Sequence, residues 1–277
     1  MKIYRYWAKA AAERGPKGMS VECFGCSNES VEAALADASV RAKKLADSIE
    51  RGGPPVLYLY EDRPVREELI REFEHDKQPT AVITRNAYGS LVLNTWHVFF
   101  ADIDYQDEGI SIGGLLGKLF GKKTPTQDEQ IIARIEEIVA SDRSLGVRVY
   151  RTKNGFRCLV RSRTYDSASD ESNRLLQQFG SDPRYVKLCQ IQACYRARIS
   201  PKPWRCGAGD PPAKFPFTNA EVEQRYREWQ SRYEEQAKSY STCAKIGDFG
   251  SASVHPEVDS VMQLHDHFAC EGDGPLA

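Results

Sequence analysis

The sequence lacks any hydrophobic run long enough to cross a lipid bilayer, and its start, Met1 to Trp7, does not have the pattern of a signal peptide. It also lacks an excess of charge of either sign, since its net charge is −1 at pH 7. A protein that binds nucleic acid over its whole surface is strongly basic. We therefore expect a cytoplasmic protein in which any contact with a polyanion is confined to a local basic channel.

The eight cysteines lack the dense spacing of a disulfide-stapled secreted module, so most of them are expected to be buried thiols. Cys23 and Cys26 have the spacing of half a zinc knuckle, but no second pair lies nearby, and we expect no structural zinc there. A group of residues near the C-terminus could ligate a metal: His255, His265, Asp266, His267 and Cys270. No helical spacing fixes their geometry, so we favour the interpretation without a metal.

The 277 residues suffice for one large domain or two small ones, and 41% hydrophobic with 28% charged residues is the balance of a soluble globular protein. We expect an α+β fold with a mainly antiparallel sheet, because turn sequences join neighbouring strands at 86–89 and 152–155. Residues 1–215 are predicted to form this domain. Residues 216–277 are predicted to form a C-terminal helix and a loosely attached tail.

Hydrophobic periodicity and turn residues predict the individual elements. Strands are expected at 1–7, 56–60, 81–85, 90–94, 96–105, 147–151, 156–161, 185–189 and 194–199. Helices are expected at 31–49, 65–73, 126–139, 170–179 and 218–237. The first helix has an apolar face formed by Val31, Leu35, Ala38, Ala42, Leu45 and Ile49. The last begins at a Thr218–Glu221 capping box, and its apolar stripe is expected to pack in the core rather than stack on bases: Val222, Tyr226, Trp229, Tyr233 and Ala237.

The stretch 96–105 is an apolar run that ends in Asp102-Ile103-Asp104. On a strand, side chains alternate between faces, so the two carboxylates point the same way and the strand is expected to be an inner one. Like charges this close repel each other unless they meet water, a basic neighbour or a divalent cation. A plain polar turn at the end of the strand is the alternative.

Two segments are basic and contain no acidic residue. One holds Arg143, Arg148, Arg151, Lys153, Arg157, Arg161 and Arg163, and the other holds Arg184, Lys187, Arg196, Arg198, Lys202 and Arg205. A basic surface that faces paired carboxylates suits phosphoryl chemistry, in which the acids hold a metal and the cations neutralise phosphates. The alternative is a solvated arginine-rich face that pairs with glutamates of the helices.

Two prolines flank Lys202 and stiffen the segment 200–206, because each proline fixes its own backbone angle and restricts the residue before it. A rigid Lys202 with Arg205 nearby is suited to clamp a phosphate. Trp204 is expected to anchor the loop in the core rather than stack on a base. A Gly-rich, basic segment at 107–125 is either a flexible cationic loop beside the carboxylates or a surface linker, and it lacks the context of a phosphate-cradling loop.

The Asp102-Ile103-Asp104 strand, the hairpin strand entered through Asn154-Gly155-Phe156-Arg157 and the basic segment 196–205 together resemble the archaeo-eukaryotic primase superfamily, which includes replicative primases and primase-polymerases. The resemblance spans roughly residues 81–206. It implies an RRM-like sheet with helices packed on one face. It also implies that Asp102 and Asp104 are catalytic ligands of Mg²⁺ or Mn²⁺ and that the partners are nucleotides and nucleic acid in DNA replication or repair.

Arg157 stands nearest the place where this superfamily has a histidine that contacts the phosphates of the incoming nucleotide. The phosphate-binding set that we expect is Arg151, Lys153, Arg157, Arg196, Arg198, Lys202 and Arg205. The superfamily's third carboxylate has three candidates here: Asp166, Asp170 and Asp182.

The sequence thus favours a primase-polymerase-like, metal-dependent nucleotidyltransferase, or a diverged relative that binds nucleotide or nucleic acid. A non-catalytic protein that binds nucleic acid or an acidic partner through the same cations is the first alternative. A metal-dependent nuclease, which needs the same carboxylates and a water nucleophile, is the second.

Overall fold

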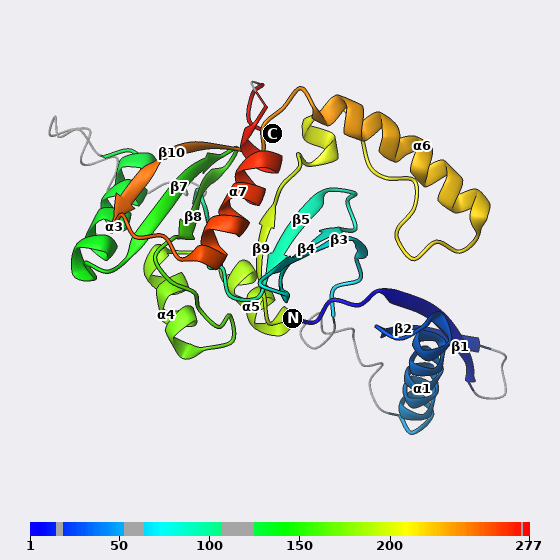
Figure 1. Ribbon diagram of the computed structural model, residues 1–277. Coiled ribbons are helices and arrows are strands. Elements are labelled where there is room, and N and C mark those ends of the chain that lie inside the picture. The colour runs from blue at the N-terminus through cyan, green and yellow to red at the C-terminus, as the bar shows by residue number, and fades with distance from the viewer. Residues whose placement is uncertain (15–18, 53–63, 107–124, 273) are drawn as a thin grey trace, which may run out of the picture.

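The computed structural model describes residues 1–14, 19–52, 64–106, 125–272 and 274–277 (Figure 1). These residues form an α+β protein whose sheets are antiparallel, as the sequence predicts. None of the described helices combines the length and the apolar character that a membrane span requires. The strand expected at 56–60 and the Gly-rich segment up to residue 124 lie outside the described residues.

The first four-stranded sheet positions the two aspartates. Its strands, in spatial order, are β10 (Cys243–Gly250), β7 (Gly146–Thr152), β8 (Gly155–Val160) and β6 (Phe100–Asp104). Helix α7 (Pro256–Cys270) lies against one face, and helices α3 (Gln127–Ser141) and α4 (Asp170–Phe179) pack on the other (Figure 1). We expected helices on one face only, but the C-terminal segment supplies a helix to the second face.

The second four-stranded sheet lies beside the first and meets it where β6 approaches β9. Its strands, in spatial order, are β3 (Glu68–His75), β4 (Gln78–Arg85), β5 (Leu91–Thr95) and β9 (Tyr195–Arg198). The β6 strand is therefore an edge strand of its sheet, not the inner strand that we expected. Helix α5 (Pro183–Gln192) bonds to this edge, because Tyr185 Oη donates to Phe100 O and Asp182 N donates to Asp102 O.

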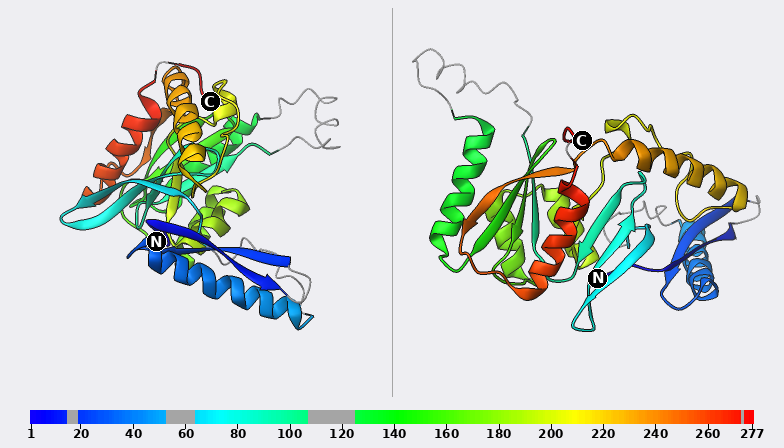
Figure 2. Two further views of the ribbon diagram at one scale, coloured as in Figure 1. Left: turned by 90° about the vertical axis from the view of Figure 1, so that its right-hand side faces the viewer. Right: turned by 45° about the horizontal axis from the view of Figure 1, so that its top comes forward.

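An N-terminal unit consists of the hairpin β1 (Tyr6–Arg14) and β2 (Met19–Ser27) with helix α1 (Val31–Glu50) packed along it (Figure 2). The helix was expected, but its buried face differs from the predicted one. Its buried residues are Ala34, Ala38, Ala42 and Ala46, whereas Val31 and Leu35 are 51% and 46% exposed. Because alanine side chains are small, this face of α1 lets the helix backbone come close to the strands, and it is therefore the face that is buried.

Helix α6 (Ala220–Ala237) carries the aromatic stripe, and Tyr226, Trp229 and Tyr233 are buried in a small core with Cys206. The prediction that this stripe packs in the core is confirmed. The cap is Asn219, one residue later than the expected Thr218, because the Asn219 side chain accepts from Val222 N.

Four sequence predictions of local structure are wrong. The strand expected at 1–7 begins only at Tyr6 and runs on to Arg14. Residues 68–75 form strand β3 instead of a helix, because they pair with β4 along its length. Residues 185–189 belong to helix α5 instead of a strand, since Asp182 caps that helix and Pro183 occupies its first turn. The expected loose tail contains β10 and α7, and α7 places Val258, Val261 and Met262 in the main core.

Substitution of Gly25 tests the packing of the N-terminal unit. A β-carbon at this position would overlap the backbone of Ala34 and Ala38 in α1. We predict that Gly25→Ala displaces the helix and costs about 3 kcal/mol of the stability of this unit, as overpacking does elsewhere. Urea denaturation followed by circular dichroism, with limited proteolysis at residues 1–52, measures the loss.

Gly247→Ala is the matched control, because its β-carbon meets only the Phe249 ring at 3.7 Å. Equal stability and protease resistance of Gly25→Ala and the wild type would show that α1 does not pack against β2 in this way.

Candidate active site at the end of strand β6

Strand β6 delivers two carboxylates to one face of the sheet. Phe100 and Ala101 are fully buried and Ile103 is 3% exposed, so packing fixes the strand. The Asp102 side chain is 36% exposed, and Asp104 is exposed at the end of the strand. No hydrogen bond from the described part of the chain reaches the Asp104 carboxylate. The expected pair of carboxylates on one face of a strand is present, although the strand covers only Phe100–Asp104 of the stretch 96–105.

A third carboxylate, that of Asp182, lies close enough to act on the pair electrostatically. Partial desolvation raises the pKa of Asp104, and the neighbouring charges of Asp102 and Asp182 raise it further, while Lys202 and Arg205 oppose the shift. Asp182 N also donates to Asp102 O at 3.1 Å. Among the three candidates for a third carboxylate, Asp182 is thus the one with contacts to this pair.

The other two candidates serve local turns and helix starts. The Asp166 carboxylate accepts from Ala168 N at 2.9 Å, within its own turn. Asp170 lies in the first turn of α4, where a negative charge favours the helix dipole. Asp182 caps α5 as well, but its place at the β6 edge is what brings it to Asp102.

Arg157 is the cross-strand neighbour of Asp102 in the β6–β8 register. Its Nε and Nη2 atoms lie 3.4 Å from Asp102 Oδ1, and its Nη1 donates to Arg198 O at 2.9 Å. The side chain is only 3% exposed. Burial at this level leaves no room for direct phosphate contact, so the structure favours a role for Arg157 in orienting Asp102 over the phosphate contact that we expected.

A cluster of cations faces the carboxylates from β9 and the loop after it. Burial and the neighbouring Arg157 lower the pKa of Arg198 to about 10, although Asp102 acts in the opposite direction. Burial, Arg198 and Arg205 likewise lower the pKa of Lys202, and Asp104 and Asp102 oppose this. The cations thus repel one another and are attracted by the two acids. Such crowded cations gain free energy when an anion binds between them.

Three other predicted phosphate ligands do not join this cluster. Arg196 is buried and paired with the buried Glu67 at 2.6 Å. Arg151 is bound to Asp128 of α3 and to Tyr105 Oη, both at 2.6 Å. Lys153 is exposed in the turn between β7 and β8, at the same end of the sheet as Asp104. The acidic partners of Arg196 and Arg151 lie far away in the sequence. Strand periodicity predicts the face on which an arginine lies but not the partner that it meets there.

An exposed aromatic pair stands beside the cations, and the sequence analysis missed it. Trp204 is 47% exposed and Tyr88 is 52% exposed, and their rings meet edge to face with centroids 5.3 Å apart. The Lys202 Nζ atom lies 5.5 Å from the centroid of the Trp204 ring. The expectation that Trp204 anchors the loop in the core is therefore wrong. Tyr88 lies in the turn Asn86–Gly89, and an aromatic residue in a turn is the feature of the sequence that could have predicted an exposed ring.

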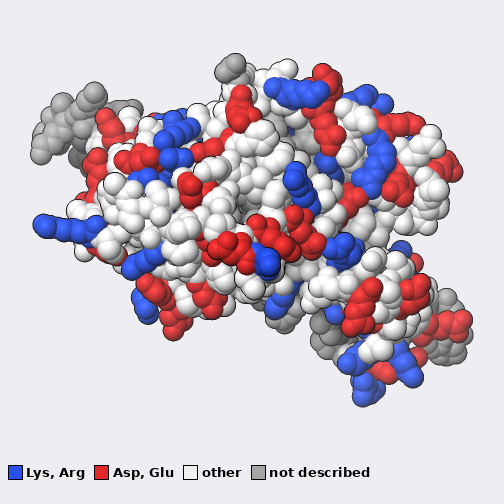
Figure 3. Space-filling view, in the orientation of Figure 1, with Lys and Arg blue, Asp and Glu red and all other residues white. Residues whose placement is uncertain are grey.

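Comparisons with protein families, curated proteins and solved structures find no match for this chain. The resemblance to the primase superfamily therefore stays a prediction, and function is inferred from the site. On the face in Figure 3, acidic and basic side chains are interspersed. This distribution agrees with the net charge of −1 and with a cation cluster that is local.

Asp104→Asn tests the repulsion among the carboxylates. The folded-state pKa of Asp104 is raised, so the folded chain holds this proton more tightly than the unfolded chain does. The resulting penalty is absent below the unfolded pKa, near about 4, and grows to its full size as pH rises through the folded pKa. We predict that Asp104→Asn stabilises the protein at pH 7 by about 0.5 kcal/mol, a small value because Asp104 is exposed.

Urea unfolding at pH 7 and at about pH 4 measures this difference, which should shrink at the lower pH. Asp47→Asn, at an exposed position of α1, is the control and should change stability little at either pH. A loss of stability in Asp104→Asn at pH 7 would contradict the prediction.

Proposed function

We propose that this protein is a metal-dependent nucleotidyltransferase of the primase-polymerase kind. The observation that carries the proposal is the open pair Asp102 and Asp104, with Asp182 beside it, facing the cations Arg198, Lys202 and Arg205. Carboxylates alone suit many metal sites. The combination with nearby cations on β9 and the loop after it favours a substrate that carries both phosphates and a metal.

The donor set fits a pair of hard divalent cations, Mg²⁺ or Mn²⁺, which prefer carboxylate oxygen and water. Asp102 and Asp104 offer oxygens from one strand, and Asp104 has no competing hydrogen bond among the described residues. Metal ions bound there supply charge stabilisation for the attacking and leaving oxygens of a phosphoryl transfer. Arg157 holds Asp102 in orientation from the neighbouring strand.

The phosphates of a nucleotide are assigned to Lys202 and Arg205, with Arg198 behind them. The loop that carries Lys202 and Arg205 is rigid, because Pro201 and Pro203 restrict it and residues 203–205 form a short 3₁₀ helix. A rigid cation loses little entropy on binding phosphate and stays in place as charge develops in the transition state.

The Tyr88–Trp204 pair is assigned to the base or to an unpaired nucleic-acid strand. Exposed aromatic rings next to cations are the recurring arrangement for binding single strands, where each stacked base contributes about 1–3 kcal/mol. This assignment favours nucleotide and single-stranded nucleic acid as partners over an acidic protein, which would need the cations but not the rings. The sheet β10-β7-β8-β6 shares with an RRM-like domain its antiparallel strands, and it departs from that pattern in having helices on both faces and the acids on an edge strand.

The test is incorporation of labelled nucleotides on single-stranded templates, with and without a primer, in Mg²⁺ or Mn²⁺. We expect metal-dependent incorporation by the wild type. Asp104→Asn should lower the rate of incorporation by about 10³-fold or more, because the metal that binds the reacting phosphates loses one of its carboxylate ligands. Lys202→Ala and Arg205→Ala should raise the KM for nucleotide, and Trp204→Ala should weaken template binding.

Two controls separate the site from general damage. Asp47→Asn should retain activity, and Lys153→Ala should change the KM less than Lys202→Ala. Salt-sensitive binding of single strands without incorporation in either metal would refute catalysis and favour the non-catalytic binding protein. Shortening of the template with no nucleotide added would identify a nuclease instead.

A further inference from the structure

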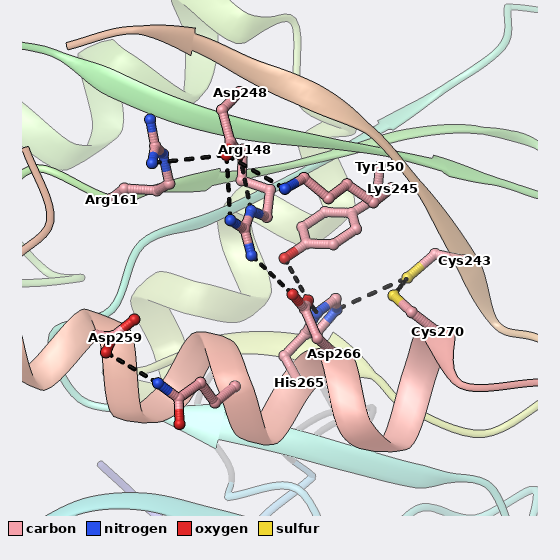
Figure 4. Close-up of polar contacts among 11 residues, drawn as sticks. Arg148, Tyr150, Arg161, Cys243, Lys245, Asp248, Asp259, His265, Asp266 and Cys270 are labelled. Carbon is pink, nitrogen blue, oxygen red and sulfur yellow. Dashed lines mark hydrogen bonds and ion pairs between the residues drawn. The ribbon is translucent and has the colours of Figure 1, made fainter. Parts of the chain in front are cut away.

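Two cysteines and a histidine meet beside Arg157, whose Nη1 atom lies 3.2 Å from the histidine. Cys243 is the first residue of β10, and His265 and Cys270 belong to α7 (Figure 4). Cys243 and His265 are fully buried, and Cys270 is partly buried. The three side chains converge although 27 residues separate the first from the last.

The distances among the three ligand atoms match those around a tetrahedral zinc ion. Cys243 Sγ lies 3.5 Å from Cys270 Sγ and 3.9 Å from His265 Nε2, and all three atoms lie within 4.8 Å of one another. Zinc–sulfur bonds of about 2.3 Å and zinc–nitrogen bonds of about 2.0 Å place tetrahedral ligands about 3.5–3.8 Å apart. A small cation therefore fits between these atoms with little movement.

The histidine is oriented from behind by a carboxylate. Asp266 Oδ1 lies 3.1 Å from His265 Nδ1, so Nδ1 holds the proton and Nε2, which lies 3.9 Å from Cys243 Sγ, keeps a lone pair for a metal. The carboxylate is fixed in turn, because Tyr150 Oη and Arg148 Nη1 donate to it at 2.5 and 2.8 Å (Figure 4). A ligand histidine backed by a carboxylate is the usual outer arrangement of zinc sites.

We propose that Cys243, His265 and Cys270 bind one zinc ion, with water in the fourth position. Two thiolates and a neutral imidazole balance the charge of Zn²⁺, so the occupied site is neutral and can be buried beside the Arg157 cation. Soft sulfur ligands with imidazole favour zinc over the magnesium or manganese proposed at the aspartates. The site ties the start of β10 to the end of α7 and does not depend on the proposed activity.

The zinc site also touches the support of the catalytic pair. Arg157 Nη1 lies 3.2 Å from His265 Nε2. Metal binding takes the Nε2 lone pair, and Arg157 keeps its bonds to Arg198 O and its contact with Asp102. The bound ion would thus fix the position of His265, which packs directly beside Arg157.

The test is the metal content of the full-length protein, purified without chelators from zinc-supplemented cells. We expect one equivalent of zinc per chain. After exchange with cobalt, we expect thiolate-to-cobalt charge-transfer bands and the visible bands of tetrahedral cobalt. Cys243→Ser, His265→Asn and Cys270→Ser should each lose the metal, and the partly buried Cys26→Ser should keep it. A chelator should lower the Tm of the wild type, and zinc should restore it.

The wild-type measurements decide the question even if a variant fails to fold. Substoichiometric zinc together with no cobalt–thiolate bands would overturn the proposal. A disulfide between Cys243 and Cys270 in freshly purified, alkylated protein would overturn it too, since it removes both thiolates. Loss of zinc in Cys26→Ser with full retention in Cys270→Ser would assign the ion to another place.

Discussion

Repulsion among carboxylates held together at the edge of one strand is the constraint on which this structure depends. Asp102 and Asp104 share a face of β6, and Asp182 adds a third negative charge from the start of α5. A fold tolerates such a group when water, cations or a metal offset the repulsion. Arg157 provides one cation from within the sheet, and β9 and the loop after it provide the others.

The surrounding elements hold these charges in place. The edge of β6 would otherwise leave carbonyl groups open, but α5 donates to Phe100 O and Asp102 O and fixes the strand between the two sheets. On the side facing α7, His265 and Asp266 pack behind Arg157 and Tyr150. The carboxylates thus stand on rigid elements, as a site for phosphoryl transfer requires.

Local pattern predicted much of this arrangement. The apolar run before Asp102 predicted strand β6, and the Asn-Gly turn predicted the β7–β8 hairpin. The capping box at Thr126 predicted helix α3. The partner of each cation was not predictable, because partners come from elements distant in sequence. Arg196 and Arg198 have the same periodicity, yet Glu67, 129 residues earlier, takes Arg196 out of the site. The polar composition of the last 37 residues likewise did not predict β10 and α7. Only a few of their side chains are buried, and these few hold both elements in the core.

Binding of Mn²⁺ tests the central claim most directly, since it needs neither template nor nucleotide. Titration of the protein with Mn²⁺, with free ion followed by electron paramagnetic resonance, should detect binding by the wild type. Asp102→Asn should weaken it by roughly tenfold or more, whereas Asp47→Asn should not. Thiolate sites compete poorly for Mn²⁺, so the cysteine cluster does not obscure the result. Equal Mn²⁺ affinity in Asp102→Asn and the wild type would contradict the account.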